Sequence, residues 1–149
     1  MPDAHRFGSV PLIADTCVWS KLRRAPEDLA ADFFAAGNAG LILSSPVVRA
    51  EWLHSAVDGS EFDERDEIFS HLREIPVTTT ACNAAISALR ELRGTGMERY
   101  WRVDLPDLLI AASAAEAAVN VLSDNRRDFA KLEEVLGFDF IDFPAEQHS

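Results

Sequence analysis

The sequence is poor in cysteine and has no long hydrophobic run. Its two cysteines, Cys17 and Cys82, cannot form a disulfide scaffold, and nothing argues for an oxidising compartment. The longest apolar stretch, residues 108–121, is interrupted by three polar residues and is too short to span a bilayer. The first residues lack the apolar core of a signal peptide. We therefore expect a cytoplasmic protein that does not associate with membranes.

Positive charge is also scarce. Lysine and arginine number 14 against 25 aspartates and glutamates, which gives a net charge of −11. Because affinity for a phosphate backbone comes mostly from lysine and arginine, a chain this acidic is a poor general nucleic-acid binder. Any nucleic-acid function would need local basic patches, or metal ions held by some of the acids.

Length and patterning indicate one α/β domain. The 149 residues fit a single domain, and 48% hydrophobic with 26% charged residues is typical of a globular protein. Short apolar runs predict strands at residues 10–14, 41–43, 75–77, 119–122 and 138–141. Helical periodicity between them predicts helices that begin at Thr16 and cover residues 46–57, 80–93, 107–118 and about 129–136. The acidic run at residues 58–67 is expected to be a solvated helix face or loop.

Such alternation predicts a mostly parallel sheet of four to five strands with helices on both faces. We expect the domain to span residues 8–143, with residues 144–149 as a flexible C-terminal tail.

Acidic residues stand where the predicted strands end. Asp15 follows the first strand, Asp124 and Asp128 follow the fourth, and Glu51 and Asp107 lie early in helices. In an open parallel sheet, ligands bind at the carboxyl ends of the strands. Carboxylates that converge there repel one another unless a cation neutralises them, and Mg²⁺ or Mn²⁺ prefers such oxygen ligands.

Each acid also has an ordinary structural interpretation. Asp15 could simply cap the helix that follows it, and Asp128 alone would be an ordinary surface acid. Asp104 is expected to cap a helix in a capping box, with Asp107 favoured by the helix dipole. Glu51 borders an apolar helix face and needs a partner if it is buried.

Other enzyme classes fit poorly. A haloacid-dehalogenase phosphatase needs a second aspartate where Cys17 stands, and a receiver domain needs adjacent acids beside Asp15. The glycine-rich phosphate loops and zinc-ligand spacings are absent from the sequence. Cys17 has no adjacent histidine that would make it a nucleophile.

Four segments contain these acids: IADTCVW (residues 13–19), SPVVRAEW (45–52), DLLIAASA (107–114) and LSDNRRDF (122–129). They closely resemble the acidic motifs of the PIN-domain ribonucleases, and within that family the chain most resembles the VapC toxins of toxin–antitoxin pairs. The resemblance covers roughly residues 10–143, and the pattern Asp-x-x-Ile-Ala-Ala that begins at Asp107 is its most specific part. It implies a three-layer α/β/α sandwich and hydrolysis of RNA by a metal-dependent endoribonuclease.

Carried over by position, the resemblance implies an acidic quartet of Asp15, Glu51, Asp107 and Asp128. Asp15 and Asp107, assisted by Asp128, would bind Mg²⁺, for which Mn²⁺ would substitute, and Glu51 would orient or deprotonate the attacking water. Thr16, Ser123 and Asn125 would be accessory polar groups. Two departures matter. Cys17 replaces the usual serine or asparagine, and Asp124 competes with Asp128 as the fourth acid.

The resemblance also implies partners: an RNA substrate, a VapB-type antitoxin and a second copy of the chain in a homodimer. Basic residues near the proposed site are RNA-binding candidates, namely Arg23, Arg24, Arg99, Arg102, Arg126 and Arg127. Tyr100 or Trp101 could stack on an unpaired base, or could instead belong to the core or a dimer contact. The alternative function is a non-catalytic PIN-fold module that binds RNA or protein.

Overall fold

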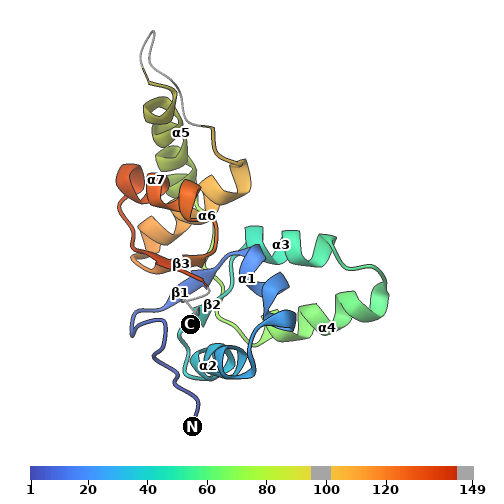
Figure 1. Ribbon diagram of the computed structural model, residues 1–149. Helices are drawn as coiled ribbons and strands as arrows, with labels where there is room; N and C mark the ends of the chain where they lie inside the picture. The colour runs from blue at the N-terminus through green and yellow to red at the C-terminus, as the bar shows by residue number, and fades with distance from the viewer. Residues whose placement is uncertain (95–101, 144–149) are drawn as a thin grey trace.

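A four-stranded parallel sheet forms the centre of the molecule (Figure 1). The computed structural model describes residues 1–94 and 102–143. Within them the strands are β1 (Leu12–Ala14), β2 (Ile42–Leu43), β3 (Asn120–Ser123) and β4 (Phe140–Asp142), in the spatial order β2-β1-β3-β4. All three pairings are parallel, with Ile13 opposite Leu43 on one side and Val121 on the other. Since every strand runs the same way, their carboxyl ends meet at one edge of the sheet.

Helices cover both faces of this sheet, which confirms the predicted three-layer arrangement. The α5, α6 and α7 helices pack together on one side, while α1 to α4 lie on the other (Figure 1). The helices are α1 (Thr16–Lys21), α2 (Glu27–Asn38), α3 (Pro46–His54), α4 (Gly59–Ser70), α5 (Thr79–Arg93), α6 (Leu105–Ala117) and α7 (Arg126–Leu136). A short 3-10 helix, η1 (Leu22–Arg24), joins α1 to α2.

The α6 helix is central to the core, as its apolar residues predict. Leu108, Ile110 and Ala111 are fully buried, and the helix packs against β1 and β3. Pro106 lies in its first turn, where a missing amide hydrogen costs no helical hydrogen bond. Even so, no helix in the described part of the chain is long and apolar enough to cross a membrane.

Several predictions from the sequence were wrong in detail. Residues 75–77 form no strand; the chain instead makes an isolated parallel bridge between Ser44 and Glu74, because Pro76 has no amide hydrogen for a longer ladder. The α2 helix was not predicted. The acidic run at residues 58–67 lies mostly on a helix, α4, in agreement with the expected solvated helix face or loop. Asp104 occupies the N-cap position of α6, but its side chain makes no capping hydrogen bond. The expected tail, residues 144–149, lies outside the described residues.

Candidate metal centre

Asp15 and Ser123 meet at the carboxyl edge of the sheet, since β1 and β3 are neighbours. The Asp15 amide donates to the Leu122 carbonyl at 2.9 Å, which places Asp15 directly beside the end of β3. The Ser123 hydroxyl then donates to Asp15 Oδ2 at 3.0 Å. Both side chains are buried. Parallel pairing thus unites residues 108 positions apart in the sequence.

Asp15 is held by its own helix as well. Its Oδ1 accepts a hydrogen bond from the Thr16 amide at 2.8 Å, so Asp15 caps α1. Burial raises the pKa of this carboxyl above its usual value, although hydrogen bonds from Ser123, Thr16 and Cys17 oppose the rise. The capping interpretation and the site interpretation therefore apply to the same residue.

Asp107 faces the same edge from the first turn of α6. It is 8% exposed, and Asn125 Nδ2 donates to its Oδ2 at 3.1 Å. Burial, followed by the charges of Asp15 and Asp104, raises the pKa of Asp107 to about 7. The charge of Glu51 acts in the same direction. Asp107 is thus a buried carboxylate surrounded by other acids.

Glu51 approaches from α3, on the other side of the sheet's edge. Its Oε1 accepts a hydrogen bond from the Thr16 hydroxyl at 2.7 Å, and both residues are half-buried. Since Thr16 follows Asp15 directly, this contact ties the α3 carboxylate to the start of α1. Thr16 is the partner that a carboxylate on an apolar helix face requires.

Asn125 connects Asp107 with Asp128. Its Nδ2 donates to Asp107 Oδ2 and, at 3.3 Å, to Asp128 Oδ2. Its backbone amide donates to the Ser123 hydroxyl at 3.0 Å, and its side chain caps α7. One asparagine therefore orients two of the predicted acids and contacts the serine that contacts a third.

Asp124, the competing fourth acid, has a different environment. It forms an ion pair with Lys21 of α1. Burial alone would raise the pKa of Asp124, but hydrogen bonds from Cys17 and Lys21 and the lysine charge leave it below the usual value. Asn125 joins Asp128 to Asp107, so Asp128 stays our preferred fourth acid.

Cys17 makes polar contacts although it replaces the usual serine or asparagine. Its Sγ lies 3.4 Å from both Asp15 Oδ2 and Ser123 Oγ. Burial, followed by the Asp15 charge, raises the pKa of this thiol. The thiol is therefore protonated and acts as a donor, which argues against a nucleophilic thiolate.

The donor set fits a hard divalent cation. Among the described residues, no lysine or arginine forms an ion pair with Asp15 or Asp107, so this part of the chain supplies no counter-ion for their charges. Within residues 1–94 and 102–143, no three histidine, cysteine, aspartate or glutamate side chains are arranged so that they could together hold a metal ion. Mg²⁺, however, typically uses one or two carboxylates and completes its shell with water and substrate oxygens. Asp15 and Asp107 could supply those two, with Glu51 and Asp128 close by.

The predicted RNA-binding arginines separate into different environments. Arg23 pairs with Glu61 at 3.2 Å, and Arg126 pairs with Asp142 at 2.6 Å. Arg102 and Arg127 are exposed, near the starts of α6 and α7. Arg24 lines a pocket together with Lys21, which lies in the same basic stretch after Asp15. Arg99, Tyr100 and Trp101 lie outside the described residues.

The PIN-domain family model matches residues 12–135. The chain is a PIN-domain protein. The match contains all four predicted acids and every strand of this PIN domain except β4. No curated protein matches the chain.

Solved toxin–antitoxin complexes contain chains with the same fold as this PIN domain. A chain of the DNA-bound VapBC complex from Salmonella typhimurium has a TM-score of 0.68 at 19% identity, covering 90% of this chain and 98% of that one. VapBC-5 from Mycobacterium tuberculosis gives 0.58 at 23%, covering 90% and 99%. VapBC-1 from nontypeable Haemophilus influenzae gives 0.68 at 15%, covering 88% and 96%. At these identities the likeness shows a shared fold.

Proposed function

We propose that this PIN domain is a metal-dependent endoribonuclease and the toxin of a type II toxin–antitoxin pair. The observation that carries the proposal is the buried pair Asp15 and Asp107, for which the described residues supply no cationic partner. Membership of a family of nucleases and the likeness to VapBC complexes support it. The proposed location is the cytoplasm, where the protein would encounter both RNA and an antitoxin.

In this proposal, Asp15 and Asp107 would hold a Mg²⁺ or Mn²⁺ ion, with Asp128 assisting. A bound divalent ion supplies positive charge for the phosphate oxygens and lowers the pKa of water. The Thr16 amide and the Ser123 hydroxyl fix the two oxygens of Asp15. Asn125 keeps the Asp107 and Asp128 carboxylates facing one another. Pre-oriented carboxylates avoid reorganisation when RNA arrives.

Glu51 would orient or deprotonate the attacking water. The Thr16 hydroxyl holds one of its oxygens at 2.7 Å, which leaves the other oxygen for a proton. Glu51 would accept a proton as water attacks phosphorus. The bond from phosphorus to the 3′-oxygen would break, and that oxygen would take up a proton from solvent water and leave as a hydroxyl. The products are then a 5′-phosphate end and a 3′-hydroxyl end.

The test is RNA cleavage by the purified chain with Mg²⁺ or Mn²⁺. Cleavage should disappear with EDTA and in Asp15→Asn and Asp107→Asn variants. Asp63→Asn is the matched control, because Asp63 is an exposed acid on α4. Comparing Asp128→Asn with Asp124→Asn assigns the fourth acid. RNA binding without cleavage in either metal would overturn the enzyme and support a non-catalytic binding module.

The proposed antitoxin is a VapB-type protein, because several solved structures with this fold are VapBC complexes. Its inhibitory group would be an arginine or lysine that enters between Asp15 and Asp107 and supplies the charge that they lack. A complex in which this edge stays open to solvent and RNA would reject that mode of inhibition. Size-exclusion chromatography with light scattering would test the proposed homodimer.

A further inference from the structure

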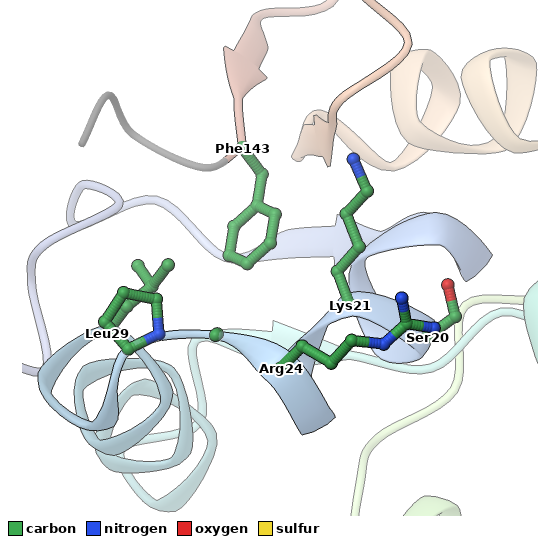
Figure 2. A pocket seen from close by; sticks show the side chains of 7 residues that line it. Ser20, Lys21, Arg24, Leu29 and Phe143 are labelled. Carbon is green, nitrogen blue, oxygen red and sulfur yellow. The ribbon is translucent and has the colours of Figure 1, made fainter. Parts of the chain in front are cut away.

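A pocket of about 430 Å³ lies beside the carboxylate edge, where α1, η1 and the start of α2 approach the end of β4. Figure 2 shows the ring of Phe143 pointing into it between Leu29 and Lys21, with Arg24 extending on the Ser20 side. The volume is within the usual range for small-molecule sites, about 300–1,000 Å³. Its lining consists of Ser20, Lys21, Arg24, Ala25, Pro26, Leu29 and Phe143.

The lining combines an apolar floor with a cationic rim. Leu29 and Phe143 are almost fully buried in the core, so they form a firm apolar surface. Lys21 and Arg24 are exposed and bring two positive charges to the opening. A nucleotide has matching parts, because its base is flat and largely apolar on its faces while its phosphate is anionic.

The pocket adjoins the proposed metal centre through two contacts. Lys21 forms its ion pair with Asp124, whose neighbour Ser123 donates to Asp15. Ser20 also lines a second pocket, of about 530 Å³, that contains Thr16 and Glu51. A single-stranded RNA bound over α1 could therefore reach both the carboxylates and the cationic pocket.

Arg24 is the charge that distinguishes this pocket. Lys21 is partly neutralised by Asp124, and the adjacent Arg23 pairs with Glu61 of α4. Within the described part of the chain, Arg24 pairs with no acid. In a chain of net charge −11, a cation without an acidic partner beside an apolar floor is a specific feature.

We propose that this pocket is a nucleotide subsite for the RNA substrate. Arg24 and Lys21 bind a backbone phosphate flanking the cleaved bond, and the surface of Leu29 and Phe143 receives the base. The inference rests on the proposed function for the identity of the substrate, but not on cleavage, because binding at the subsite requires no metal.

The test compares Arg24→Ala with Arg23→Ala, a matched control one residue away. Binding of a mixed-sequence single-stranded RNA octamer is measured in EDTA at several salt concentrations. Arg24→Ala should weaken binding by about tenfold, the loss expected for one charge-assisted hydrogen bond to phosphate. It should also lower the salt dependence of log K by about 0.7. Arg23→Ala should change neither, and equal effects of the two substitutions would overturn the subsite.

A second variant tests whether the apolar surface of Leu29 and Phe143 binds the base. Ala25→Leu narrows the pocket without removing a charge. It should weaken binding of nucleoside 5′-monophosphates while leaving binding of inorganic phosphate unchanged. Unchanged binding of the mononucleotides would refute the proposal that the base enters this pocket. Circular dichroism spectra of both variants should match the wild type.

The two proposals fail separately. Cleavage that responds equally to Arg23→Ala and Arg24→Ala overturns the subsite and leaves the nuclease standing. Octamer binding that depends on Arg24, in a protein that cuts no RNA with either metal, overturns the nuclease and leaves the subsite standing.

Discussion

Asp107→Asn should stabilise the metal-free protein although it deletes a carboxylate of the proposed site. Burial and the Asp15 charge raise the pKa of Asp107 from its usual 3.8 to about 7, so at pH 8 folding places an unfavourable charge there. At about 1.4 kcal/mol per pKa unit, this difference sets a ceiling of roughly 4 kcal/mol on the penalty. We expect a gain of about 2 kcal/mol, because solvent and polar neighbours relax around the charge.

The gain should depend on pH. The folded-state pKa of Asp107 lies above the unfolded one, so the wild type loses stability as pH rises from about 4 through 7. Asparagine does not titrate, and the advantage of the variant should therefore shrink towards pH 4. In thermal unfolding with EDTA at pH 8, a gain of 2 kcal/mol corresponds to an increase in Tm of roughly 4–8 °C. Saturating Mg²⁺ should stabilise the wild type more than the variant.

Asp124→Asn is the matched control and should have the opposite sign. Its carboxylate pairs with Lys21 and its pKa is lowered, so it stabilises the fold above pH 4 and loses that effect as pH falls. Because Lys21 is half-exposed, the loss at pH 8 should be at most about 1 kcal/mol. An Asp107→Asn variant no more stable than wild type at pH 8, or with a gain independent of pH, would refute the electrostatic reasoning.

Three further predictions each depend on a single residue. Mg²⁺ binding at pH 6 should release close to one proton, because Asp107 with a pKa of about 7 is mostly protonated in the metal-free protein; calorimetry in two buffers of different ionisation enthalpy measures the release. Thr16→Val removes the hydroxyl that holds Glu51 and should lower kcat more than it changes KM, whereas Thr16→Ser should restore kcat. Ala118 caps α6 at φ 57°, so Ala118→Gly should raise the free energy of unfolding by about 1 kcal/mol in urea denaturation.

The features predicted from the sequence are those with local signals. The α6 helix is apolar nearly all round, which indicates burial whatever surrounds it. The α2 helix also carried a signal, since Leu29, Phe33 and Ala36 recur at helical spacing after two acids in the first turn. Its N-cap position is Pro26, which has no capping side chain, and we predicted no helix there. The pocket lined by Arg24 and Phe143 was not predicted either, because Pro26 and Leu29 of the same region also line it.

Neighbouring arginines could not be separated from the sequence. Arg23 and Arg24 are adjacent in the chain, carry the same charge and follow Asp15 by nearly the same number of residues. Their difference comes from the geometry of η1, which directs Arg23 towards Glu61 of α4 and leaves Arg24 in the lining of the pocket that also contains Phe143, next to the end of β4. Both partners come from distant parts of the chain, so spacing alone carries no information about which arginine stays available for a phosphate.

The same reasoning explains why two acids in one turn have different roles. Asp124 and Asp128 both follow β3, and either could have completed the quartet. Asp124 meets Lys21, so its charge is already compensated within the protein and has little need of a metal ion. Asp128 instead shares the amide of Asn125 with Asp107, a carboxylate without a cationic partner among the described residues. A cation that binds Asp107 therefore gains from Asp128 as well, and Asp128→Asn should weaken Mg²⁺ binding more than Asp124→Asn does.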